Sequence, residues 1–206
     1  MHRRTALSVS AALLAAAPLL TACSGQARPG TAAVVGGERI TTSAVQAKVN
    51  DVRAAQHASP QAAALISGSA GLERSKLERM IQLAVLEKAA KDAGVTVTVK
   101  EVEDFRKLQV ERAGGADKLE AAALQAVVAP GQIDDDFRFK LLRDKLYDHY
   151  GSQDKAVDGI RAVAEKMRIQ LNPRYGTWDA QAIGLGDKGT PWITQRTRPE
   201  QPPAGA

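Results

Sequence analysis

The stretch AKDAGVTVTVKEVEDF, residues 90–105, decides the fold because it ends one helix and starts another. Gly94 stands where a glycine in the left-handed conformation commonly follows a helix C-terminus. Thr98 and Glu101 have the spacing of a capping box, in which each side chain bonds the backbone amide of the other residue. The sequence therefore predicts two helices joined by a short extended segment.

The residues before this junction predict a strand, a reversal and two helices. AAVVGGERI, residues 32–40, combines a β-branched run with a glycine pair, which favours a strand followed by a tight turn. Thr41 or Thr42 is suited to cap a helix in which Val45, Val49 and Val52 recur on one face. Apolar residues from Leu72 to Ala93 form a stripe too wide for a helix that faces water on most sides. We expect this segment to be the central helix.

The residues after the junction predict more helices and one returning strand. A helix is expected from Ala116 to Val127, then one that starts near Pro130, where proline suits the first turn, and ends at Gly151. A last helix is expected from Gln153 to Met167. It leads into RIQLNP, residues 168–173, where alternation and the Asn-Pro pair indicate a short strand that ends at a turn.

The first 22 residues have the pattern of an export signal. Arg3 and Arg4 precede an Ala/Leu run from Ala6 to Leu20, which is short for a membrane span of about 20 apolar residues. LTAC, residues 20–23, resembles the lipobox of bacterial lipoproteins, which implies that Cys23 is diacylated and becomes the first residue. The alternative is a secretory signal followed by an incidental cysteine. Cys23 is the chain's single cysteine, so an internal disulfide is excluded.

Composition suggests one folded unit between two flexible ends. Residues 23–31 are predicted to be a tether, residues 32–180 the folded domain, and residues 181–206 a disordered tail rich in glycine and proline. Removal of residues 1–22 takes two arginines away and leaves a net charge of +3. Because basic and acidic residues alternate along the chain, we expect no nucleic-acid partner.

The order of these segments resembles a known family. GGERIT (36–41), the junction quoted above, GGADKLEAAALQ (114–125) and VAPGQIDDDFRFKLLRDKL (128–146) are similar to the amino-terminal domain of SurA- and PrsA-type extracytoplasmic chaperones. The similarity covers about residues 32–150. It implies a mainly α fold in which a two-stranded sheet joins the first strand to the returning strand. Only seventeen residues separate Tyr150 from Arg168, whereas a parvulin domain needs on the order of a hundred.

The family resemblance implies a chaperone outside the cytoplasm that binds unfolded or exported polypeptides. The lipobox implies that this chaperone is lipid-anchored, and the missing parvulin domain implies that it lacks prolyl isomerase activity. A dedicated interaction subunit of a cell-envelope complex is the alternative. Clients, oligomeric state and the choice of membrane stay open. The residues that we expect to line a peptide groove, or else to belong to the core, are Phe105, Leu108, Leu124, Phe137, Phe139 and Tyr147.

Other motifs give weak support to catalysis or ligand binding. GLGDKG, residues 184–189, fits a pyrophosphate-binding pattern, but Thr190 and Pro191 follow it where a helix should start. Asp134 to Asp136 are consecutive, unlike the alternating ligands of a calcium loop. His57 and His149 have no nucleophile or metal ligand near them in sequence, so a hydrolase is a third and minor hypothesis. We expect no enzyme activity, no metal and no cofactor.

Overall fold

The structure, a computed structural model, describes residues 29–186. The signal segment, Cys23 and residues 187–206 lie outside the described residues. The helices are α1 (Thr42–Ala58), α2 (Ala62–Ser67), α3 (Leu72–Asp92), α4 (Val99–Ala113), α5 (Ala116–Gln125), α6 (Ile133–Tyr150) and α7 (Gln153–Lys166), with short 3₁₀ helices η1 (Pro130–Gln132) and η2 (Pro173–Tyr175). The strands are β1 (Thr31–Val35), β2 (Glu38–Thr41), β3 (Gln170–Leu171), β4 (Thr177–Asp179) and β5 (Gly184–Gly186).

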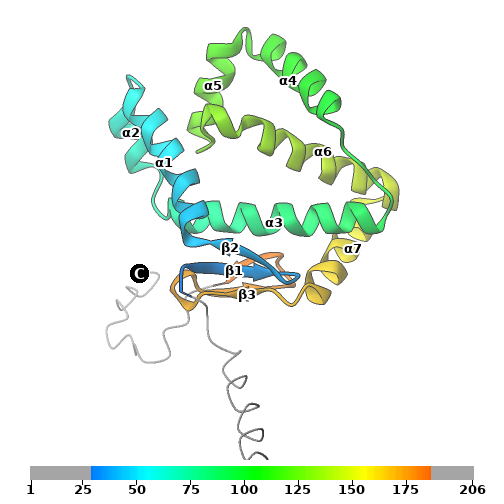
Figure 1. Cartoon of the computed structure of the whole chain (residues 1–206). Helices are drawn as coiled ribbons and strands as arrows, with labels where there is room; N and C mark the ends of the chain where they lie inside the picture. Colours follow the sequence, from blue (N-terminus) through cyan, green and yellow to red (C-terminus); the bar gives the residue numbers. More distant parts are fainter. Residues whose placement is uncertain (1–28, 187–206) are drawn as a thin grey trace, which may run out of the picture.

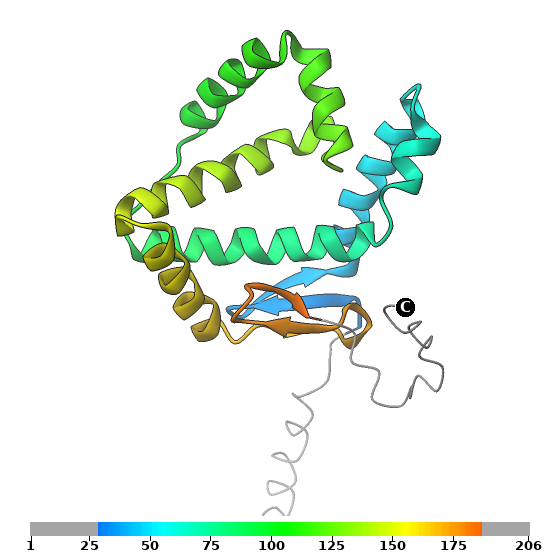
Figure 2. The ribbon, with the colours of Figure 1, turned by 180° about the vertical axis from the view of Figure 1, so that it is seen from behind.

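The long helix α3 lies between the sheet and the other helices. Figures 1 and 2 show the strands on one side of α3 and α6 on its other side, with α4 and α5 beyond α6. Leu77, Ile81 and Val85 of α3 are fully buried, and they belong to the main core cluster together with Phe137 and Leu146 of α6. The predicted central helix and the mainly α fold are confirmed.

The first strand and the returning strand pair as expected. Ala33 lies opposite Leu171 and Val34 opposite Gln170 in an antiparallel pair. The sheet nevertheless has three strands in the order β2-β1-β3, one more than the two-stranded sheet predicted. The third strand forms because Gly36 and Gly37, at φ of 59° and 89°, reverse the chain within two residues and bring β2 onto the other edge of β1.

The predicted helix ends are confirmed at the junction. Thr98 caps α4 by accepting a hydrogen bond from the amide of Glu101, and the Glu101 carboxylate accepts one from the amide of Thr98 at 2.8 Å. Gly94, which follows the C-cap of α3, has a φ of 69°. Between Tyr150 and Arg168 the chain forms a single helix, α7, where a parvulin domain was excluded on length.

Two expectations need correction. The short helix α2 was missed, because its six residues include no buried side chain and so form no apolar stripe. The tail predicted to be disordered from residue 181 is ordered to residue 186, where β5 pairs with β4. Side chains of α3 hold this segment: Gln82 donates to the carbonyl of Ile183 at 3.0 Å, and Glu78 accepts from the amide of Leu185 at 3.1 Å.

No helix between residues 29 and 186 is long and apolar enough to cross a membrane.

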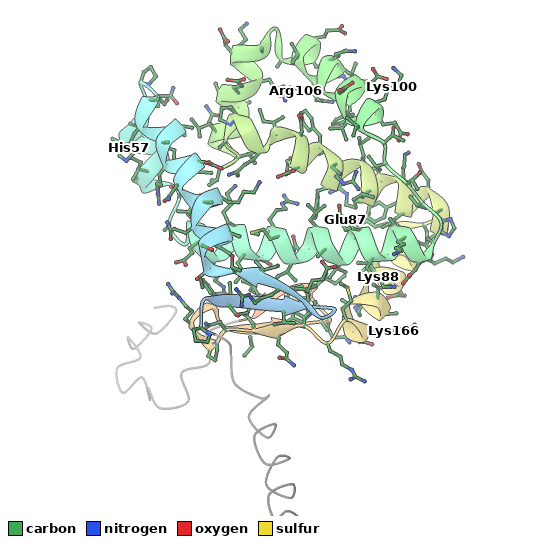
Figure 3. The ribbon with its side chains drawn as sticks, viewed as in Figure 1. His57, Glu87, Lys88, Lys100, Arg106 and Lys166 are labelled. Atoms are coloured by element: carbon green, nitrogen blue, oxygen red, sulfur yellow. The ribbon has the colours of Figure 1, made fainter. Side chains whose placement is uncertain are left out.

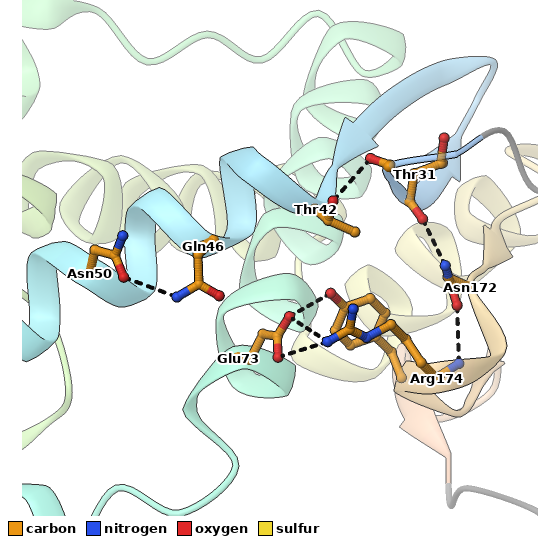
Figure 4. A network of polar contacts seen from close by, with 9 residues as sticks. Thr31, Thr42, Gln46, Asn50, Glu73, Asn172 and Arg174 are labelled. Atoms are coloured by element: carbon orange, nitrogen blue, oxygen red, sulfur yellow. Dashed lines mark hydrogen bonds and ion pairs between the residues drawn. The ribbon is translucent and has the colours of Figure 1, made fainter.

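Replacing Asn172 tests how strongly the returning strand holds the domain. Its side chain donates to the carbonyl of Thr31 at 3.0 Å and accepts from the amide of Arg174 at 3.1 Å (Figure 4). We expect Asn172→Ala to lower the free energy of unfolding by about 1–2 kcal/mol, because it removes one hydrogen bond to the distant first strand and one local bond that caps η2. Urea denaturation measures the change.

Asn50→Ala is the matched control. Asn50 is exposed on α1 and accepts one local hydrogen bond from Gln46, also drawn in Figure 4. This variant should change the free energy of unfolding by no more than about 0.5 kcal/mol. Equal effects of the two variants would contradict the proposed role of Asn172.

Candidate functional site

Two of the six predicted groove residues are part of the core. Phe137 is 6% exposed in the main core cluster, and Leu124 is 7% exposed in a second cluster with Val49 and Val52 of α1. Phe105 is half-buried and meets Phe137 edge to face, with ring centroids 5.0 Å apart. These three side chains stabilise the packing of helices.

The other three candidates are partly or largely exposed. Leu108 of α4 is 40% exposed. Phe139 and Tyr147 of α6 are half-buried, and each lies against a guanidinium: Arg79 is 3.9 Å from the Phe139 ring centroid and Arg143 is 5.8 Å from that of Tyr147. A peptide-binding role for any of the six residues stays a prediction.

The structure shows a cavity that sequence reasoning missed. It has a volume of about 190 Å³ and is lined by residues of α1, the first half of α3, the segment after α5, η1 and the start of α6. Figure 1 shows α1, the end of α5 and the first turns of α3 and α6 on the left of the domain. We call this cavity the Lys76 cavity. Its apolar lining consists of Met80, Leu83, Ala126, Val127 and Val128, and its polar lining of Lys48, Ser75, Lys76, Arg79, Gln132, Asp135 and Asp136.

A hydrogen-bond network around Gln132 joins the walls of this cavity. Gln132 is buried, and its amide group donates to the carbonyl of Lys48 at 2.9 Å and to the carboxylate of Asp51 at 3.3 Å. Its side-chain oxygen accepts a hydrogen bond from Lys76 at 2.8 Å. The side chain of Gln132, in η1, is thus bonded both to α1 and to Lys76 of α3.

The end of α5 brings a carbonyl to the same ammonium group. Val127 has a φ of 62°, the left-handed conformation, which is unfavourable for a β-branched residue. Its amide bonds the carbonyl of Leu124 at 3.0 Å, and the next amide bonds the carbonyl of Ala123 at 2.8 Å, which closes the helix as a Schellman motif. The carbonyl of Val127 accepts from Lys76 at 2.6 Å.

Two ion pairs lie in the lining of the cavity. Lys48 of α1 lies 2.7 Å from the carboxylate of Asp135, and Arg79 of α3 lies 3.3 Å from that of Asp136. Both carboxylates are in the first turn of α6, where the helix dipole favours negative charge. Charged side chains elsewhere are spread over several elements, as Figure 3 shows for Glu87 and Lys88 on α3 and for Lys100 on α4.

Lys76 differs from these cations because its partners are neutral. Within residues 29–186 its ammonium has two hydrogen-bond acceptors, a carbonyl and an amide oxygen, and no ion pair. Partial burial, reinforced by the neighbouring charge of Arg79, lowers the pKa of Lys76 to about 8. The cavity therefore contains a partly desolvated cation beside apolar side chains.

The sequence did contain one signal for this residue. Lys76 lies four positions after Leu72 and four before Met80, so it stands within the apolar stripe of α3. A lysine on such a face indicates a polar partner or a cavity. Gln132 and Val127 gave no comparable signal, because their partners lie on segments far away in sequence.

The returning segment forms a second hollow. It has a volume of about 300 Å³ and is lined by Ile169, Leu171, Pro173, Gly176, Thr177 and Trp178. Trp178 packs against the main core and lines this hollow together with Ile169 and Leu171. Its indole N–H is buried without a hydrogen-bond partner among the described residues.

The described residues contain no candidate metal site. Residues 29–186 contain no group of three or more His, Cys, Asp or Glu side chains that could hold an ion. His57 lies on α1, labelled in Figure 3, whereas His149 lies on α6 and meets Tyr150 edge to face at 5.1 Å.

Replacing Gln132 tests the network. We expect Gln132→Leu to lower the free energy of unfolding by about 1–3 kcal/mol, since three hydrogen bonds are lost and the carbonyl of Lys48 loses this donor. Gln46→Leu, on the exposed face of α1, should change it by no more than about 0.5 kcal/mol. Chemical denaturation measures the free energy of unfolding of both variants. If Gln132→Leu is as stable as the unmodified protein, the network does not hold the walls together.

Comparison with known families identifies the domain. The chain matches the SurA-like N-terminal domain over residues 4–143, which reaches from the predicted signal segment into α6. Neither the curated proteins nor the solved structures contain a match to it. The matched part covers β1 to α5 and most of α6, including every residue that lines the Lys76 cavity. The chain therefore belongs to the family of SurA-like N-terminal domains.

Proposed function

We propose that this protein is a lipid-anchored, extracytoplasmic chaperone that holds extended or partly folded exported polypeptides and does not isomerise prolyl bonds. The observation that carries the proposal is the Lys76 cavity, which has apolar and polar lining and lies within a domain of a chaperone-related family. A cavity of about 190 Å³ has room for one or two client side chains.

The energetics of such a site suit transient holding. Burial of apolar client surface contributes about 25 cal/mol per Å², so one or two side chains give weak binding. Many unfolded polypeptides contain side chains that can make such weak contacts. Several segments with such side chains along one client raise the chance that one of them occupies the cavity at any moment.

The arrangement of the chain supports holding without isomerisation. In SurA- and PrsA-type chaperones the parvulin domain is inserted before the returning segment. In this chain the corresponding connection is α7, fourteen residues long, which packs on α3 and α6. Residues 29–186 form one helical domain with its strands.

The anchor is the second part of the proposal. Leu20 to Cys23 has the lipobox pattern at the end of an apolar run, so Cys23 is proposed to carry the acyl chains, palmitate among them, after residues 1–22 are removed. Several acyl chains hold a protein stably on a membrane, at about 0.8 kcal/mol per buried CH₂. The cavity would then act at the outer face of the membrane on polypeptides that emerge from export.

Holding activity is tested by aggregation of an unfolded client. Residues 24–206 are purified without the lipid, and light scattering follows a denaturant-unfolded exported protein upon dilution. We expect suppression at stoichiometric amounts. Ser75→Trp, which places a large side chain at the cavity from an exposed position on α3, should reduce it.

Two controls accompany this test. Ser67→Trp, on α2 outside the cavity, should suppress aggregation as well as the unmodified chain does. Crosslinking in cells should return many unrelated exported proteins. Absence of suppression together with one saturable partner would replace the chaperone proposal by the dedicated interaction subunit.

Lipidation is tested by replacing the cysteine. Cys23→Ala should abolish labelling by a palmitate analogue and move the protein from the membrane fraction to the soluble extracytoplasmic fraction, because the thiol is the acylation site. The neighbouring Ser24→Ala should keep the label. Membrane retention of unlabelled Cys23→Ala would refute the anchor.

A further inference from the structure

The Lys76 ammonium group has unused binding capacity. It carries three N–H donors. Val127 and Gln132 accept two of them, at 2.6 Å and 2.8 Å. Neither acceptor carries a charge. Among the described residues, no carboxylate contacts the ammonium, so its positive charge is not neutralised by an ion pair.

The acidic residues nearby are already committed to other groups. Asp135 pairs with Lys48 at 2.7 Å and Asp136 with Arg79 at 3.3 Å. Asp51 of α1 accepts from the amide of Gln132 at 3.3 Å. The charged groups that act on the pKa of Lys76 are Lys48 and Asp51 from α1, Arg79 from α3 and Asp136 from α6, and Asp135 of α6 lines the same cavity.

The balance of these surroundings favours a bound anion. Desolvation, Arg79 and Lys48 disfavour the charged form of Lys76, and they outweigh Asp136 and Asp51, which favour it. A carboxylate that accepts the third N–H would offset this cost. It would enter with apolar neighbours, since Met80, Leu83 and Val128 line the same cavity.

We propose that the Lys76 cavity selects client segments in which an aspartate or glutamate stands next to an apolar residue, with Lys76 binding the carboxylate. This inference rests on the proposed holding function. The occupant is an internal segment of an extended polypeptide, because in an unfolded client internal segments far outnumber chain ends. The apolar neighbour packs on Met80 and Leu83 while the acidic side chain reaches the ammonium.

Binding of short peptides tests this selection. The probe is an acetylated, amidated and fluorescently labelled peptide of glycine and serine with a central Leu-Glu-Leu, compared with its Leu-Gln-Leu version. Fluorescence anisotropy with residues 24–206 should show about tenfold tighter binding of the glutamate peptide, because the ammonium then meets a charged carboxylate, whereas the amide oxygen of glutamine is a neutral acceptor.

Variants assign the preference to Lys76. Lys76→Met should bind both peptides equally, whereas Lys91→Met, an exposed lysine on the same helix and outside the cavity, should keep the tenfold preference. If Lys76→Met does not fold, Ser75→Trp serves instead. It keeps Lys76 and its acceptors but fills the cavity, and it should weaken binding of the glutamate peptide.

The pH dependence gives an independent readout. Because the ammonium must be charged to bind a carboxylate and its pKa is about 8, the preference for glutamate should decline as the pH rises from 7 to 9.5. In Lys76→Arg the preference should persist over this range, since a guanidinium stays charged. A preference with the same pH profile in both proteins would overturn the inference.

The remaining outcomes separate this inference from the proposed function. Equal binding of the two peptides by the unmodified protein would overturn the selection and leave holding intact. Failure of both peptides to bind, together with failure to suppress aggregation, would overturn the function and the inference alike. Tighter binding of the Leu-Gln-Leu peptide when its carboxyl terminus is left free, lost in Lys76→Met, would assign the cavity to chain ends and refute internal segments.

Discussion

The antiparallel pairing of β1 with β3 is the constraint on which the rest of the domain depends. It joins residues 33 and 171, which are separated by nearly the whole described chain. Because β1 is also paired with β2, its backbone groups are bonded on both edges, and Ala32, Ala33 and Val35 can be buried beneath α3. The closing of a long loop costs entropy that grows slowly with its length, and this burial offsets it.

The same pairing fixes the elements that follow it. The amide of Gly36 in the β1–β2 turn bonds the carbonyl of Met167 at 2.9 Å, which ties the end of α7 to the sheet. Beyond β3, the hydroxyl of Tyr175 donates to Glu73 at 2.6 Å, and Arg174 lies 3.4 Å from the same carboxylate (Figure 4). The start of α3 is thereby held between the two ends of the domain, and α3 supplies one wall of the Lys76 cavity.

The other walls depend on a polar network within an otherwise apolar contact. Gln132 and Lys76 join α1, α3 and the end of α5 through groups that are largely desolvated, where a hydrogen bond is strong and an unmade one is costly. The Lys76 cavity differs from the peptide groove expected on α4, α5 and α6, because Phe105, Phe137 and Leu124 pack between helices and leave little surface for a client.

The sequence by itself determined the helices other than α2, the cap of α4 and the identity of the two strands that close the domain. These features rest on local causes: the Thr98–Glu101 capping box, the left-handed Gly94, the Gly36–Gly37 reversal and the apolar periodicity of residues 72–93. Only the tertiary structure decided the rest. The ordering of residues 181–186 depends on Glu78 and Gln82 of α3, and the cavity depends on Gln132 and Val127 meeting Lys76 from segments more than fifty residues away. Contacts between distant segments leave no periodic trace in the sequence, because each partner by itself is an ordinary polar residue or helix end.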